Sequence, residues 1–290
     1  MNEGTNPKER STRETEADDA RAADFAEDER FESGATRYAD YLQTTEGRLR
    51  LDLAWLNLLE FIRQTFPSTS GETERRALDA GGGTGALALR LAAEGWRTDV
   101  LDSSTAMLAL ASVAARRAGH SNQLSLHEGD AARLGEIFAP ATFDLVACHN
   151  VLEYVEDPSA VVRSVAAAAR RGGLVSLLAR NRAGEALRAA VKAQDLDAAR
   201  RALTAAAVKE SLYGGPAKLF GPEPLRALAF DAGLEVLATR GVRVVADYLP
   251  ASLSNTEDDY RRLLDFELTL GARTDFAAVA RYTQLVARRT

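Results

Sequence analysis

The alternation of short apolar runs with amphipathic stretches predicts an α/β fold. Five apolar runs have the length of strands and lie at 76–80, 98–101, 124–127, 143–148 and 174–179. Stretches rich in Ala and Leu separate most of them, and their spacing is typical of helices. Strands that alternate with helices in this way form a mostly parallel sheet with helices on both faces. Ligands of such sheets bind at the carboxyl ends of the strands.

The regions on either side of this core extend the prediction. Residues 31–66 are amphipathic, with Leu49, Leu53, Leu56 and Leu59 recurring at helical spacing. We expect N-terminal helices in 31–73, within one domain of residues 31–290. After the core, the chain predicts helices at 223–232 and 257–270, strands at 234–239 and 281–287, and an extended stretch at 242–245. The two additional strands make a seven-stranded sheet.

Residues 181–213 interrupt the alternation. They are rich in Ala, Arg, Leu and Lys and carry no strand pattern. We therefore predict a helical insertion, spanning 181–220, that lies over the acceptor side of the site.

Charge is unevenly distributed along the 290 residues, whose net charge is -6. Residues 1–30 hold ten acidic and five basic residues and few apolar ones, so we expect a disordered acidic leader. The remainder is nearly neutral, with 31 basic and 32 acidic residues. No strongly basic domain indicates nucleic-acid binding, although the balance does not exclude it.

Other features exclude several classes of protein. No run of 18 uncharged apolar residues is present, so we expect no membrane span. The single cysteine, Cys148, cannot form an internal disulfide and fits a cytoplasmic protein. Three histidines and one cysteine offer no metal-binding spacing, so we expect no metal. The oligomeric state is not determined by the sequence.

A glycine-rich loop is the strongest chemical signal. It reads Asp79-Ala80-Gly81-Gly82-Gly83-Thr84-Gly85 and joins a predicted strand to a predicted helix. Its G-x-G-x-G spacing differs from the G-x-G-x-x-G of dinucleotide-binding folds. A second acid, Asp102, ends the next apolar run. This arrangement resembles the binding loop of the Rossmann-like class I S-adenosylmethionine (SAM) methyltransferases.

The resemblance implies a role for each of these positions. Asp79 would anchor the loop and face the cationic end of SAM through water, or else cap the turn. Asp102 would accept hydrogen bonds from both ribose hydroxyls, or else cap the next helix. The remaining cofactor contacts expected here are Gly81, Gly82, Gly83 and Ser103.

Two further segments follow the third and fourth predicted strands. Asp130, with Ala131, occupies the position at which these methyltransferases bind adenine; the alternative is a surface aspartate. His149 ends the fourth strand and would lie beside the methionine portion of SAM; the alternative is a buried structural histidine. The turn from Leu152 to Pro158 resembles the family turn, with Tyr154 where the family usually has His.

Segments outside this core resemble one family more specifically. They are Thr44–Arg50, Gly241–Val244 with Asp247–Leu249, and Ala280–Tyr282. Together they resemble the bacterial tRNA 5-carboxymethoxyuridine methyltransferases over residues 35–289, with an interruption near 187–220. That family uses SAM to esterify the carboxylate of a modified wobble uridine. By position, Arg50 matches its SAM-contacting arginine.

A carboxylate acceptor needs positioning rather than a base, because it is already ionised at neutral pH. Arginine suits this task, since its planar fork binds a carboxylate. We expect Arg243 and Tyr154 to act in catalysis. Other candidates for the acceptor side are Arg180, Arg182, Tyr213 and Tyr248.

Three functions remain open. The first is methylation of carboxymethoxyuridine in tRNA. The second is methylation of a small-molecule carboxylate or another acceptor, because the eight basic and five acidic residues of 181–226 are dispersed rather than clustered. The third is a non-catalytic binding module on a SAM-binding scaffold.

Overall fold

The computed structural model describes residues 30–67, 74–210 and 212–290. The proposed acidic leader, apart from its last residue, and most of the polar loop after Phe66 lie outside these ranges. Within them no helix is both long enough and apolar enough to cross a membrane.

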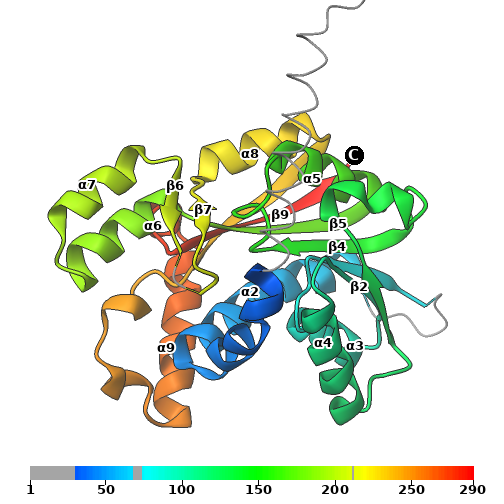
Figure 1. Ribbon diagram of the computed structural model, residues 1–290, viewed down its shortest axis with the longest axis horizontal. Coiled ribbons are helices and arrows are strands. Elements are labelled where there is room, and N and C mark those ends of the chain that lie inside the picture. Colours follow the sequence, from blue (N-terminus) through cyan, green and yellow to red (C-terminus); the bar gives the residue numbers. More distant parts are fainter. Residues whose placement is uncertain (1–29, 68–73, 211) are drawn as a thin grey trace, which may run out of the picture.

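A seven-stranded sheet, in the order β3-β2-β1-β4-β5-β9-β8, forms the centre of the fold (Figure 1). Its parallel part confirms the predicted alternation and contains β1 (Arg76–Ala80), β2 (Arg97–Asp102), β3 (Leu124–Glu128), β4 (Phe143–His149) and β5 (Ala169–Arg180). Antiparallel pairing with β9 (Tyr282–Arg289) joins β5 to β8 (Leu234–Val242). The predicted mostly parallel sheet is therefore confirmed.

Helices cover both faces of the sheet, as predicted. One face packs against α2 (Thr45–Thr65), α3 (Ala86–Ala93), α4 (Thr105–Ala118) and α9 (Glu257–Gly271). The other face packs against η1 (Ala131–Glu136), α5 (Pro158–Ala168) and α8 (Pro222–Asp231). The two largest apolar clusters lie on the two faces, because buried strands present side chains to both. The short helices η3 (Ala246–Tyr248), η4 (Ala251–Ser254) and α10 (Thr274–Ala277) complete the C-terminal region.

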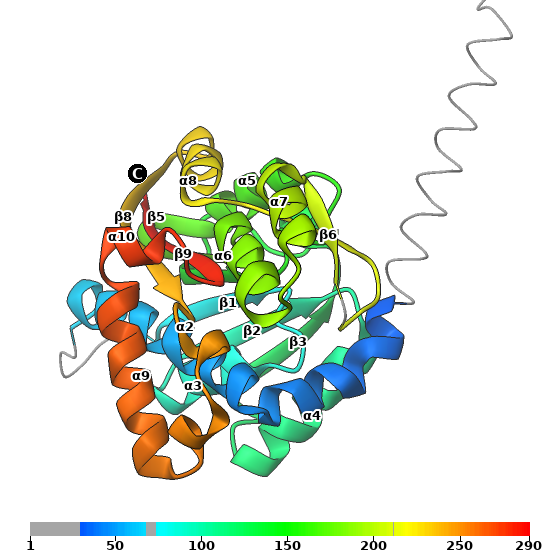
Figure 2. The same cartoon turned by 90° about the vertical axis from the view of Figure 1, so that its left-hand side faces the viewer.

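The sequence predicts a helical insertion after β5, but the structure shows that this segment is not purely helical. It contains α6 (Arg182–Leu187), the single-turn η2 (Arg188–Lys192) and α7 (Leu196–Thr204), followed by a hairpin of β6 (Ala207–Lys209) and β7 (Pro216–Lys218). Strands of three residues are too short to produce a pattern in the sequence. Since β5 leads directly into α6, this segment lies beyond the carboxyl end of the sheet (Figure 2).

Two other boundaries differ from the prediction. Strand β5 begins at Ala169, before the predicted strand of 174–179, and an irregular register with β4 accommodates its first residues. Strand β8 ends at Val242, because Arg243 adopts a left-handed φ of 61° and turns the chain away from the predicted extended path.

Residues 30–43 form a helix that lies beside α4 (Figure 2). Glu32 accepts hydrogen bonds from the backbone N–H of Ala106 and the hydroxyl of Thr105, in the first turn of α4. A carboxylate at a helix N-terminus is favoured by the helix dipole. This contact fixes the helix of residues 30–43 over the carboxyl end of the sheet.

The turn after β8 is fixed by one buried carboxylate. Glu267 of α9 is fully buried and accepts hydrogen bonds from the backbone N–H groups of Val244, Val245 and Ala246, at 2.6, 2.9 and 2.6 Å. Burial raises its pKa, although these three bonds oppose the rise. The same turn carries Arg243, so Glu267 determines the position of that guanidinium.

We predict that Glu267→Gln lowers the free energy of unfolding by about 2–4 kcal/mol, because the amide leaves buried backbone donors poorly paired. Urea denaturation measures the change. Glu235→Gln, at an exposed position of the edge strand β8, is the matched control and should change stability by less than about 0.5 kcal/mol. Equal stability losses in the two variants would contradict the assigned role of Glu267.

Candidate active site

One cavity of about 1010 Å³ lies at the carboxyl ends of the parallel strands. Its wall includes residues that follow β1, β2, β3 and β4, the segment after β5 and the turn after β8. Most predicted site residues line it, and these are Arg50, Gly81, Gly83, Asp102, Ser103, Asp130, Ala131, His149, Tyr154 and Arg243. Asp79 and Gly82 do not line the cavity.

The glycine loop explains these two exceptions. Asp79 is buried behind the loop, and a Cβ at Gly82 would lie 2.8 Å from its carboxyl carbon. Gly82 therefore turns toward Asp79 rather than toward the cavity. Gly81, with a φ of 70°, lies so close to Val151 that a Cβ would come within 2.2 Å of its methyl group. The loop thus lines the cavity with backbone rather than side chains.

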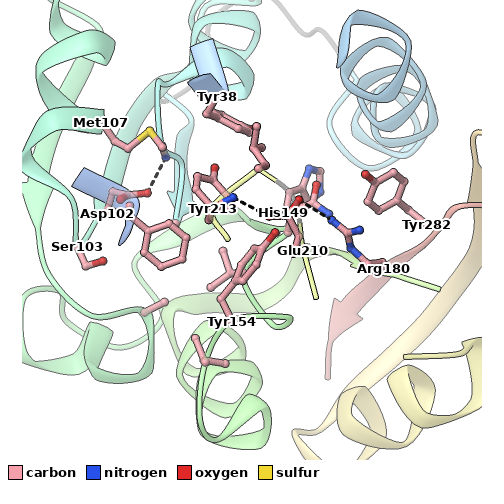
Figure 3. A pocket seen from close by; sticks show the side chains of 18 of the residues that line it. Tyr38, Asp102, Ser103, Met107, His149, Tyr154, Arg180, Glu210, Tyr213 and Tyr282 are labelled. Atoms are coloured by element: carbon pink, nitrogen blue, oxygen red, sulfur yellow. Dashed lines mark hydrogen bonds and ion pairs between the residues drawn. The ribbon is translucent and has the colours of Figure 1, made fainter. Parts of the chain in front are cut away.

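Asp102 joins the glycine loop to the start of α4. Its Oδ2 accepts from the backbone N–H of Gly83 at 2.8 Å, and its Oδ1 accepts from Ser104 at 3.0 Å. Ser104 in turn caps α4 by accepting from Met107. Asp102 is only partly buried and reaches the cavity, as Figure 3 shows.

This end of the cavity favours a cationic ligand. Burial, followed by repulsion from Asp102, raises the pKa of Asp79 to about 7. A positive charge near both acids relieves this repulsion. The two acids suit the positively charged sulfonium and amino group of SAM. The carboxylate oxygens of Asp102 can accept hydrogen bonds from its ribose, and the glycine loop leaves space for it.

The side chain of Asp130 is exposed to solvent, although the residue lines the cavity. Its Oδ1 accepts from the backbone N–H of Ala132 at 2.7 Å and caps η1. It also forms an exposed ion pair with Arg133, at 3.8 Å. The side chain of Asp130 therefore has a structural partner, while the backbone of Ala131 reaches the cavity.

His149 is held as a neutral group. Its Nε2 lies 2.7 Å from the hydroxyl of Ser176, and burial together with the charge of Arg50 lowers its pKa to about 3. Arg50 is itself fixed, because it donates to the side chains of Asn150 and Tyr38. These contacts place a neutral imidazole next to a buried cation.

Four aromatic side chains cover the middle of the cavity, and we call them the aromatic roof; they are Phe31, Tyr38, Tyr154 and Tyr213. Their neighbouring ring centroids are 4.9–6.2 Å apart. Figure 3 shows Tyr38, Tyr154 and Tyr213 converging on the cavity. Burial, followed by the charge of Glu153, raises the pKa of Tyr154, so this phenol stays protonated.

Buried ion pairs form the opposite end of the cavity. Arg180 lies 3.5 Å from Glu210 and 3.8 Å from Glu185, which also pairs with Arg281. Arg243 pairs with Asp247 and donates to the Tyr41 hydroxyl at 3.1 Å. Both Nη atoms of Arg243 are therefore engaged, and its Nε is buried without a hydrogen-bond partner among the described residues.

Two other acceptor candidates lie outside the cavity wall. Arg182 donates to the carbonyls of Ala205 and Leu219, at 3.2 and 3.1 Å, and ties the segment after β5 together. Tyr248 does not line the cavity either, whereas Arg180 and Tyr213 do.

Sequence reasoning assigned no role to several residues of the cavity wall, namely Phe31, Tyr38, Tyr41, Asn150, Glu185, Glu210, Asp247, Arg281 and Tyr282. Most lie outside the strand ends that carry the recognisable loops. Arg281 and Tyr282 could have been found from the sequence only through the family resemblance, which included Ala280–Tyr282. Among the described residues, no group of three or more His, Cys, Asp or Glu side chains could hold a metal ion.

Comparison with known proteins agrees with this geometry. A family model described as a methyltransferase domain matches residues 78–175. The chain is 28% identical to a tRNA 5-carboxymethoxyuridine methyltransferase of Escherichia coli K12, over 91% of this chain and 97% of that protein. It is 30% identical to a ubiquinone biosynthesis O-methyltransferase of Ralstonia nicotianae, over 63% of this chain and 71% of that protein.

The chain belongs to the class I SAM-dependent methyltransferases. A solved structure of similar fold is the magnesium protoporphyrin IX methyltransferase of Synechocystis PCC 6803 with bound SAH. It has a TM-score of 0.60 and 18% identity, and the match covers 91% of this chain and 98% of that one. With the enzyme class shown, the alternative of a non-catalytic module loses its support.

We predict that Asp102→Ala weakens SAM binding by this methyltransferase about 30-fold or more, because two charge-assisted hydrogen bonds that shape the site are lost. Isothermal titration calorimetry measures the dissociation constant. Asp130→Ala is the matched control and should weaken binding less than about 5-fold, since its carboxylate is exposed. Unchanged SAM affinity in Asp102→Ala would refute the role of this carboxylate.

Proposed function

We propose that this methyltransferase transfers the methyl group of SAM to a carboxylate oxygen, with carboxymethoxyuridine in cytoplasmic tRNA as the first-choice acceptor. The observation that carries the proposal is a group of buried arginines at the acceptor end of the cavity, namely Arg180, Arg243 and Arg281. Each is paired with a buried carboxylate, so an anionic acceptor would bind to the donors that these pairs leave unused.

Unused hydrogen-bond donors also support an anionic acceptor. The Nε atoms of Arg50, Arg180 and Arg243 are buried without a hydrogen-bond partner in the described part of the protein. Buried donors that lack partners carry a free-energy cost, which a bound acceptor oxygen would relieve.

The titratable groups of the cavity favour an acceptor that is already ionised. His149, with a pKa of about 3, is too weak a base to remove a proton at neutral pH. Tyr154, with its raised pKa, keeps its own proton. A carboxylate needs neither group as a base, because it is ionised at neutral pH.

In this mechanism the protein chiefly positions the reactants. SAM supplies an electrophilic methyl group on a positively charged sulfur. The glycine loop and Asp102 hold the donor end, the arginines hold the acceptor end, and the aromatic roof excludes water between them. Alignment of this kind contributes on the order of 7–11 kcal/mol in favourable cases.

The tRNA acceptor is supported by similarity along nearly the whole chain to the Escherichia coli enzyme. A small-molecule acceptor is the second candidate. It is supported by the similarity to the ubiquinone biosynthesis O-methyltransferase of Ralstonia nicotianae described above.

The first test is methyl transfer from labelled SAM to bulk tRNA that lacks the terminal ester, followed by nucleoside mass spectrometry. We expect an alkali-labile methyl ester on carboxymethoxyuridine. Asp102→Ala serves as the negative control, because we expect it to bind SAM weakly. SAM binding without transfer to any tRNA would reject the tRNA acceptor, and a screen of small carboxylic acids and phenols would follow.

We further predict that Arg243→Lys lowers kcat/KM for the acceptor about 10- to 100-fold, because lysine keeps the charge beside Asp247 but loses the planar fork. SAM affinity should change less than about 3-fold, since Arg243 lies at the acceptor end. Arg240→Lys, whose guanidinium pairs with Glu60 outside the cavity, is the matched control. Equal activity of Arg243→Lys and wild type would remove Arg243 from the acceptor site.

A further inference from the structure

Tyr282 occupies a distinctive place at the acceptor end of the cavity. It is the first residue of β9 and pairs with Arg180 of β5 on one side and Val242 of β8 on the other. Its side chain is buried and lines the cavity. Figure 3 shows its ring next to the Arg180 side chain.

The hydroxyl of Tyr282 is oriented by a second tyrosine. Arg243 donates from Nη1 to the hydroxyl oxygen of Tyr41, and a guanidinium can only donate. The single proton of Tyr41 is then available for the oxygen of Tyr282, and the interaction with Tyr282 contributes to the raised pKa of Tyr41. This direction of bonding leaves the Tyr282 proton for another acceptor.

The charge around this pair makes Tyr282 a strong donor. Burial opposes ionisation of Tyr282, but the nearby positive charges outweigh it and lower its pKa. These charges belong to Arg180, Arg243, Arg281 and Arg50. Burial, followed by the Tyr282 charge, raises the pKa of Tyr41 to about 12, so Tyr41 retains its proton. A phenol with a lowered pKa donates a stronger hydrogen bond to an anion.

We propose that the Tyr282 hydroxyl, oriented by Tyr41, donates a hydrogen bond to the acceptor carboxylate and thereby selects an anionic acceptor. This inference rests on the proposed function. The bond holds one carboxylate oxygen and leaves the other free to attack the methyl carbon. In that step the O–CH3 bond forms, the C–S bond breaks, and sulfur keeps the electron pair. No proton is transferred, so Tyr282 acts as a donor throughout.

The test compares Tyr282→Phe with wild type on tRNA that lacks the terminal ester. We expect kcat/KM for the tRNA to fall about 10- to 100-fold, with SAM affinity within about 2-fold of wild type by calorimetry. Tyr260→Phe is the matched control, because it removes a buried phenol hydroxyl, bonded to Asp52, outside the cavity. It should leave kcat/KM within about 2-fold of wild type.

The pH profile separates a contact with the acceptor from a structural role. As pH rises through the lowered pKa of Tyr282, wild type loses this donor and gains a negative charge that repels the carboxylate. The alkaline decline in kcat/KM should therefore be absent in Tyr282→Phe. The titratable and charged groups that interact with Tyr282 come from several elements packed around it and are Tyr41, Arg50, Tyr154, Arg180, Arg243 and Arg281. Glu185 and Asp247 line the same cavity.

Each outcome separates this inference from the proposed function. Ester formation by wild type, with kcat/KM and pH profile unchanged in Tyr282→Phe, would overturn the role of Tyr282 and leave the proposed function intact. Absence of any carboxylate ester with wild type would overturn both. A Tyr282→Phe variant that fails to fold is replaced by Tyr41→Phe, which removes the orienting hydrogen bond. Wild-type kinetics and an unchanged pH profile in Tyr41→Phe would then reject the proposal.

Discussion

The acceptor end of the site depends on an alternating chain of buried charges. Arg180, Glu185, Arg281, Asp247 and Arg243 follow one another as ion-paired neighbours, and all are buried. Burying such charges is costly, and removal of one partner leaves another uncompensated. This chain of charges joins the end of β5 and the adjoining α6, the turn after β8 with η3, and Arg281 just before β9, three regions that are distant in sequence. Their side chains therefore take up their positions together, and Glu267 fixes the turn in which the chain ends.

The two ends of the cavity carry different charged groups. Asp79 and Asp102 lie at the donor end, while Arg180, Arg243 and Arg281 lie at the acceptor end among the carboxylates that pair with them. For the carboxylate acceptor proposed above, each wall attracts one charged reactant. Methyl transfer removes both charges, because the sulfonium becomes a neutral thioether and the carboxylate becomes a neutral ester. The walls then hold the products less strongly than the reactants, which favours release.

The parts of the structure that local sequence determines were predicted well. The parallel strands and the glycine loop follow from runs of neighbouring residues, and their positions agree closely with the structure. The hairpin of β6 and β7 was missed because its strands are too short to show a period. The motif also suggested Asp79 and Gly82 as contacts, but Asp79 is buried behind the loop and Gly82 faces it, so Gly81 and Gly83 line the cavity instead. Pairs such as Arg281 with Glu185 escape sequence reasoning altogether, because only the tertiary fold selects among many possible partners.

The aromatic roof depends on the close approach of residues 30–43 to the segment that carries Tyr213. At the contact point the helix has Gly34, and a Cβ there would lie 2.5 Å from the Tyr213 ring. The absence of a side chain at Gly34 therefore allows the two segments to approach this closely. Related enzymes with a bulkier residue at this position must either hold the helix farther out or turn the tyrosine aside. A residue without a side chain at position 34 is thus a condition for the aromatic roof to close as it does here.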